Sequence, residues 1–176
     1  AASSAALQRV DGIGVKIAAS IRENADGRFA DETLSLCERE NVKIILEGDD
    51  DYPRLLATIP DPPAILFMRG AFAAADALSV AIVGSRHANA YGRRITEQLA
   101  GGLARAGYTV TSGLARGIDA AAHCGAIAAG GRTIAVLGSG VLNIYPPEHD
   151  QLAEEVVAHG AVVSAVSYTH LTLPTI

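Results

Sequence analysis

Three short segments of the sequence combine glycine with serine or arginine, as phosphate-binding loops do. Glycine lets the backbone approach a ligand closely, a serine hydroxyl can donate a hydrogen bond, and an arginine guanidinium can form two parallel hydrogen bonds with a phosphate. One such loop is usually only a turn, whereas three loops, two of them with arginine, indicate an anion-binding site. The candidate residues are Gly84, Ser85 and Arg86 in the first loop, Ser112, Gly113, Arg116 and Gly117 in the second, and Gly138 and Gly140 in the third.

Asp119 and His123 follow the second loop and lie four residues apart, so on a helix their side chains share one face. They allow two interpretations. One is an acid–base pair for catalysis. The other is a supporting role, in which Asp119 stabilises the start of the helix and His123 packs against a neighbouring loop. The supporting role is favoured because no nucleophile and no trio of metal ligands accompanies the pair.

Tyr145 precedes Pro146 and Pro147, which make the loop after the third segment rigid. Its ring could stack on a nucleic-acid base or pack against the protein, and the sequence leaves both open.

Other patterns that would indicate a specific chemistry are missing. The dinucleotide fingerprint fails because Asn143 stands where its third glycine would fall, and neither G-x-x-x-x-G-K-[ST] nor G-x-S-x-G is present. Cys37 and Cys124 lie far apart and match no metal spacing. We therefore expect neither a metal nor a cofactor.

Strands and helices that alternate along the second half of the chain must position these loops. The expected strands are 78–83, 108–112, 132–137 and 161–166, and the expected helices are 90–106, 118–129 and 148–159. This alternation predicts right-handed βαβ units in an α/β fold with a parallel, Rossmann-like sheet. Strands that are apolar throughout predict helices on both faces of the sheet. The candidate loops follow three consecutive strands, at the carboxyl edge where such sheets bind ligands.

A small helical module is expected at residues 1–40, before the Rossmann-like domain at 41–166 and an irregular, non-native tail at 167–176. The turn Gly12-Ile13-Gly14 with the helix after it is typical of the second half of a helix-hairpin-helix. Its amides could meet a phosphate and Lys16 would add charge, but a small packing module is the favoured interpretation. A helix is also expected at 31–40, strands at 42–46 and 64–68, and a brief helix at 52–59 that Pro60 ends.

The composition is that of a globular domain with a small appendage, because 49% of the 176 residues are hydrophobic and 19% are charged. No apolar run reaches the roughly 18 residues of a membrane span, and no secretory signal is visible, so a cytoplasmic protein without membrane contact is expected. The net charge of −5 is unevenly distributed, since residues 79–147 contain six arginines and only two acids. These arginines either form a local anion-binding face or are simply solvated.

Read together, these segments resemble the DNA-processing protein A family (DprA, also called Smf). The resemblance covers about residues 50–164, and its ordered set of motifs is far more specific than any single loop. The matching stretches are Tyr52-Pro53, Asp61-Pro62-Pro63, IVGSR at 82–86 followed by Tyr91-Gly92, SGLARGID at 112–119 with His123, GGRTIAVLGSG at 130–140, Tyr145-Pro146 and Gly160.

The resemblance implies an extended Rossmann-like fold that binds single-stranded DNA, protects incoming strands during natural transformation and helps to load the RecA recombinase. Members are homodimers and are not established enzymes. By position, Arg86 would be the principal phosphate contact, Ser112, Gly113 and Gly117 would line the same pocket, and Tyr145 would border the strand. The family continues with Ser-Glu after the fourth strand, whereas Ala165 follows Ser164 here. A truncated member is therefore expected, without much of the surface for dimerisation and recombinase binding.

Two other functions remain open at this point. The same pocket could belong to a nucleotide or nucleoside-phosphate hydrolase that uses Asp119 and His123 for acid–base catalysis. Such hydrolases commonly contain P-G-G-x-G-T, which this sequence lacks. The chain could also be a structural remnant that binds nothing, in which case its thermal unfolding would not be cooperative.

Overall fold

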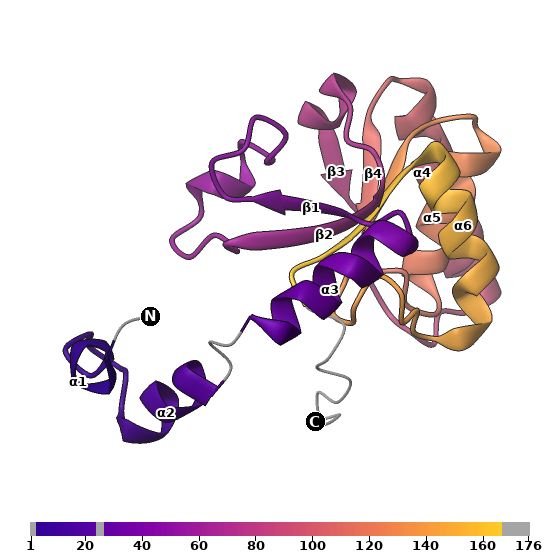
Figure 1. Ribbon diagram of the computed structural model, residues 1–176. Helices are drawn as coiled ribbons and strands as arrows, with labels where there is room; N and C mark the ends of the chain where they lie inside the picture. Colours follow the sequence, from indigo (N-terminus) through magenta and orange to yellow (C-terminus); the bar gives the residue numbers. More distant parts are fainter. Residues whose placement is uncertain (1–2, 24–26, 167–176) are drawn as a thin grey trace. The chain divides into compact units, whose positions relative to one another are not determined.

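The computed structural model describes residues 3–23 and 27–166, which form two units with a boundary between Glu40 and Asn41 (Figure 1). None of the described helices is both long enough and apolar enough to cross a lipid bilayer. The tail expected at 167–176 lies outside the described residues.

The first unit is helical and consists of α1 (Ser4–Leu7), α2 (Val15–Glu23) and α3 (Arg28–Arg39). Ser3 caps α1, because its hydroxyl oxygen accepts a hydrogen bond from the Ala6 amide at 3.2 Å. The turn before α2 contains Gly12 at a φ of +83°, a backbone conformation that favours glycine. Helix α2 begins directly after Gly14, as the sequence predicts.

The second unit is built on a six-stranded mixed sheet with the order β1-β2-β6-β5-β4-β3. Its strands are β1 (Lys43–Leu46), β2 (Ile65–Gly70), β3 (Ser79–Ala81), β4 (Thr109–Ser112), β5 (Thr133–Leu137) and β6 (Gly160–Ser164). Its α-helices are α4 (Ala90–Arg105), α5 (Ile118–Ala128) and α6 (Asp150–His159), and its 3-10 turns are η1 (Leu56–Thr58), η2 (Ala74–Ala77) and η3 (Pro147–His149). Strands β3 to β6 are parallel, which confirms the predicted βαβ core. Strands β1 and β2 extend this sheet in antiparallel pairing and make it mixed.

Helices α4, α5 and α6 cover one face of the sheet (Figure 1), whereas the sequence predicted helices on both faces. The difference follows from the strand order, since β3, β4, β5 and β6 are spatial neighbours in the order of the chain. Three right-handed crossovers that all step in the same direction place their helices on the same side. The core beneath these helices contains buried residues of α4, β4 and α5, namely Ala100, Ala104, Val110, Ala122 and Ala126.

The opposite face is covered by the connection between β1 and β2. Val110 pairs with Thr133, so the next residue, Ile134, points to this second face. The second core contains Ile45, Tyr52, Leu66, Met68, Ile134, Ala161 and Val163. The Tyr52 hydroxyl fastens the connection by donating to the Pro63 carbonyl at 2.7 Å.

The helix expected at 52–59 is only the single 3-10 turn η1. Pro60 disfavours the helical conformation of the residue before it, and Ile59 is extended, with a φ of −74° and a ψ of 157°. The segment therefore serves as a cover for the sheet and not as a helix.

Helices α4 and α5 pack closely because two glycines leave room between them. A Cβ atom on Gly125 would lie 2.4 Å from the Glu97 carbonyl oxygen, and one on Gly101 would lie 3.2 Å from the Gly125 carbonyl oxygen. A Cβ atom on Gly102, the next residue of α4, would meet nothing within 4 Å.

We predict that Gly125→Ala lowers the free energy of unfolding by about 1–3 kcal/mol, because the added methyl group forces the two helices apart. Gly102→Ala is the matched control, since open space and the higher helix propensity of alanine leave stability unchanged or raise it by up to about 1 kcal/mol. Urea unfolding of the 176-residue chain, followed by circular dichroism, measures both. Equal stability of the two variants would show that the α4–α5 contact is not tight.

Candidate nucleic-acid interface

The three candidate loops lie side by side at one edge of the sheet. Strands β3, β4 and β5 are parallel neighbours, so the segments that leave their carboxyl ends share this edge. The Ile82 amide donates to the Thr111 carbonyl at 2.9 Å, which continues the pairing of the first two strands up to the loops.

The carboxylate of Asp119 joins the first loop to the second. One oxygen accepts a hydrogen bond from the Gly84 amide at 3.4 Å, and the other accepts from the Gly113 amide at 3.1 Å. Asp119 is buried in the first turn of α5, where a negative charge also suits the helix dipole. The sequence suggested that Asp119 stabilises its own helix; in the structure its hydrogen bonds hold the two loops.

Gly117 allows the same two loops to touch. Its φ is +80°, and a Cβ atom there would lie 2.2 Å from the Ser85 carbonyl oxygen. That carbonyl also accepts a hydrogen bond from the Ile118 amide at 3.2 Å. A residue with a side chain at position 117 would separate the loops.

The two candidate serines have different surroundings. Ser112 is buried, and its hydroxyl donates to the Ile82 carbonyl at 2.6 Å, so it stabilises the strand ends and does not face a ligand. Ser85 is exposed, and its oxygen accepts a hydrogen bond from the His87 amide at 3.1 Å. Of the two hydroxyl groups, that of Ser85 is the one a bound anion can reach.

The two candidate arginines also differ. Arg86 is exposed, and within residues 3–23 and 27–166 its side chain has no hydrogen bond or ion pair. Arg116 is bound by the Glu148 carboxylate at 2.6 Å and lies over the Tyr145 ring, with 5.9 Å between guanidinium carbon and ring centre. The hydrogen bond with Arg116 lowers the pKa of Glu148, and both groups remain charged at neutral pH.

The third loop contributes backbone and an aromatic ring. Gly138 is exposed, whereas Gly140 is buried and its carbonyl accepts a hydrogen bond from the Asn143 amide at 2.9 Å. Tyr145 is 61% exposed, so one side of its ring remains available for stacking.

His123 is fully buried and bonded to strand β5, whereas the sequence suggested contact with a loop. The Thr133 hydroxyl donates to the Val110 carbonyl at 2.8 Å, so its oxygen accepts the hydrogen of the His123 Nδ1 atom at 2.7 Å. The Nε2 atom then has no hydrogen, and it has no partner among the described residues. Burial, with a contribution from His149, lowers the pKa of His123 from 6.5 to about 4, and the ring is neutral at pH 7.

Sequence reasoning missed two residues that fix the second loop. Leu114 is buried with a φ of +59°, a conformation that is uncommon outside glycine. Its carbonyl accepts a hydrogen bond from the His149 Nδ1 atom at 2.8 Å. No local pattern marks either residue, because the contact joins positions 35 residues apart.

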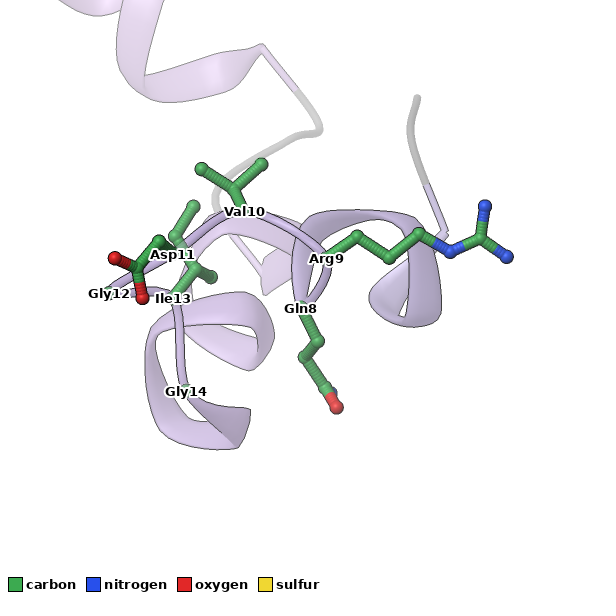
Figure 2. Close-up of a pocket in the computed structure, with 7 residues that line it drawn as sticks. All are labelled: Gln8, Arg9, Val10, Asp11, Gly12, Ile13 and Gly14. Atoms are coloured by element: carbon green, nitrogen blue, oxygen red, sulfur yellow. The ribbon is translucent and has the colours of Figure 1, made fainter.

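Figure 2 shows the turn between α1 and α2, a hollow lined by residues 8–14. The side chain of Arg9 extends away from the two glycines, and the carboxylate of Asp11 lies beside Gly12. A carboxylate beside the turn amides repels a phosphate, which favours the packing interpretation of this module.

No group of three His, Cys, Asp or Glu side chains is placed to hold a metal ion in the part of the chain that the structure describes. The groups at the sheet edge that a ligand can reach are the exposed backbone of Gly138, the Ser85 hydroxyl, the guanidinium groups of Arg86 and Arg116, and the Tyr145 ring. Together they can bind a chain of phosphates.

Comparison with known proteins identifies one family. The model of the DNA recombination-mediator protein A family matches residues 43–174. Protein Smf of Synechocystis is 38% identical over 163 residues, and DNA processing protein DprA of Bacillus subtilis is 36% identical over 132 residues. These alignments cover 90% and 74% of this chain but only 41% and 44% of the two relatives, so the chain spans less than half of their length.

Two solved structures have a similar fold. DNA processing protein A from Streptococcus pneumoniae has a TM-score of 0.76 and 30% identity, covering 94% of this chain and 56% of that one. The Helicobacter pylori protein, whose structure describes its binding mode for single-stranded DNA, has a TM-score of 0.63 and 27% identity. That match covers 72% of this chain and 56% of that one.

The burial of His123 makes the free energy of unfolding depend on pH. Between pH 6.5 and about 4 the unfolded chain binds a proton at this residue that the folded chain does not, so stability falls as the pH falls through this range. His123→Asn keeps an amide that can donate to Thr133 but cannot titrate. We expect the unfolding free energy of the unaltered chain to fall by about 1.4 kcal/mol more per pH unit than that of the variant.

Urea unfolding at half-unit steps from pH 7 to pH 4 measures the two slopes. Parallel slopes would mean that His123 becomes protonated in the folded chain as readily as in the unfolded one.

Proposed function

Because this chain belongs to the DNA recombination-mediator protein A family, we propose that it binds single-stranded DNA at the three glycine loops. The observation that carries the proposal is the side chain of Arg86, which is exposed and has no hydrogen bond or ion pair among the described residues. It follows directly after the exposed residues Gly84 and Ser85. The DNA-binding mode described for the similar Helicobacter pylori protein supports the same ligand.

In this proposal, successive phosphates of the strand lie along the edge formed by the loops after β3 and β4. The guanidinium of Arg86 holds one phosphate by paired hydrogen bonds, while the Ser85 hydroxyl donates a further hydrogen bond to it. The exposed Tyr145 ring stacks on a base that a single strand can present and a duplex cannot. Such contacts read the backbone, so binding depends strongly on salt and little on sequence.

The positions of Asp119 and His123 support binding over hydrolysis. The Asp119 carboxylate is buried and used by two loop amides, and the His123 ring is buried and neutral at pH 7. A general base needs to reach the proton that it removes, and neither side chain is exposed at the loop edge. We therefore propose a binding protein that is not an enzyme and uses no cofactor.

The wider role that we propose is the one implied by the family resemblance. The chain would act in the cytoplasm on incoming DNA during natural transformation. Loading of RecA and formation of homodimers belong to the same proposal.

Arg86→Ala should weaken binding of a fluorescent oligo-dT about tenfold, because one guanidinium–phosphate contact is lost. The slope of log K against log salt should also become shallower by about 0.7, the value for one phosphate on a single strand. Arg54→Ala is the matched control, since Arg54 is exposed and lies in the connection between β1 and β2, at the far edge of the sheet from β3. Fluorescence anisotropy at several salt concentrations, with a duplex of the same length beside the single strand, provides both readouts.

Equal losses in the Arg86 and Arg54 variants would mean that binding reflects general charge, and tighter binding of the duplex would contradict the stacking contact. If the folded chain binds no DNA, a nucleotide-hydrolysis screen tests the alternative function.

A further inference from the structure

Arg116, one of the two arginines at the loop edge, is paired with a carboxylate of the protein itself. Arg116 follows β4, and its Nε atom donates to a Glu148 carboxylate oxygen at 2.6 Å. The side chains are 49% and 53% exposed, so the pair lies at the surface where a ligand would arrive. A carboxylate meets a guanidinium as a phosphate oxygen would.

Glu148 is held in this place by its neighbours. The segment 145–149 contains Pro146, which is fully buried, and the 3-10 turn η3. On one side of Glu148, the Tyr145 ring lies under the Arg116 guanidinium. On the other side, His149 donates to the Leu114 carbonyl. The second loop and this segment are thus joined on both sides of the carboxylate.

Arg86 and Arg116 differ in whether the protein already occupies their guanidinium groups. Both arginines leave the carboxyl ends of neighbouring strands, yet within the described residues Arg86 has no partner and Arg116 is paired. A phosphate that binds Arg86 meets no competitor on that side chain. A phosphate that binds Arg116 has to replace the Glu148 carboxylate.

We propose that Glu148 is an internal competitor for DNA phosphate at Arg116. It occupies the guanidinium in the free protein and is displaced when a strand binds, so it sets the affinity of the second loop below that of the first. A free anion that contacts only Arg116 binds weakly, because it exchanges one ion pair of this guanidinium for another of similar strength. A strand anchored at Arg86 presents its next phosphate at high local concentration and can displace Glu148. The inference rests on the proposed function, since it concerns the same loop edge.

Glu148→Gln tests the proposal because it keeps the shape of the side chain and removes its charge. We expect this variant to bind oligo-dT about three- to tenfold more tightly than the unaltered chain. Glu155→Gln is the matched control, an exposed glutamate of α6 that removes the same charge away from Arg116. It should change the affinity less than twofold, because exposed charges are screened over about 10 Å at moderate salt.

A double-mutant cycle separates competition from a general charge effect. In an Arg116→Ala background there is no guanidinium at this position for the Glu148 carboxylate to occupy. Glu148→Gln should therefore raise the affinity for oligo-dT no more than Glu155→Gln does. Urea unfolding of each variant verifies folding, and the exposed ion pair should contribute little to it.

The outcomes distinguish the two proposals. Absence of oligo-dT binding by the folded chain and by the Glu148 variant alike overturns the proposed function. If binding depends on Arg86 but the Glu148 and Glu155 variants have equal affinities, the proposed function stands and the proposal that Glu148 competes with DNA phosphate is wrong. A gain from Glu148→Gln that persists without Arg116 also overturns it.

Discussion

The geometry of the loop edge depends on the buried carboxylate of Asp119. Its two oxygens accept hydrogen bonds from the Gly84 and Gly113 amides, and these bonds bring two loops from neighbouring strands into one surface. The absence of a side chain at Gly117 completes this contact, since the Ser85 carbonyl occupies the space that a Cβ atom would need. With the buried groups used for assembly, the charged groups left at the surface of these loops are Arg86 and the Arg116–Glu148 pair. In these short loops, Asp119 and Gly117 hold the structure together, whereas Arg86 and Arg116 are the residues that can contact a ligand.

Much of the fold could be predicted from local patterns. Apolar segments that alternate with helices of similar length predict parallel βαβ units, and glycines mark the strand ends. The bounds of α4, α5 and β5 therefore differ from expectation by one residue at one end each. The patterns do not show what covers a sheet. The position of the helices on one face follows from the strand order, and the cover on the other face comes from the Tyr52 connection, which joins the sheet through long-range contacts.

The candidate site was predictable to the same extent. The spacing of strands and glycine loops places Gly84, Gly113 and Gly138 at one edge, because parallel strands end together. It does not show which polar groups are used inside the protein. Ser112 donates to a backbone carbonyl, His123 is bonded to Thr133, and Arg116 is paired with Glu148, each with a partner at least ten residues away. Such pairings depend on the packed structure, and sequence types alone leave these side chains equally available.

Binding of single-stranded DNA at this edge of the sheet can be mapped residue by residue through the backbone amides. Nitrogen–proton correlation spectra of the 176-residue chain would be recorded while oligo-dT is added at moderate salt. If phosphates bind at the loops, the largest chemical-shift changes will occur at the amides of Gly84, Ser85, Arg86, Arg116 and Gly117, with smaller changes in the Tyr145 segment. Shifts confined to the turn around Gly12 and Gly14, or spread along the outer surface of α4 and α5, would contradict binding at the loops.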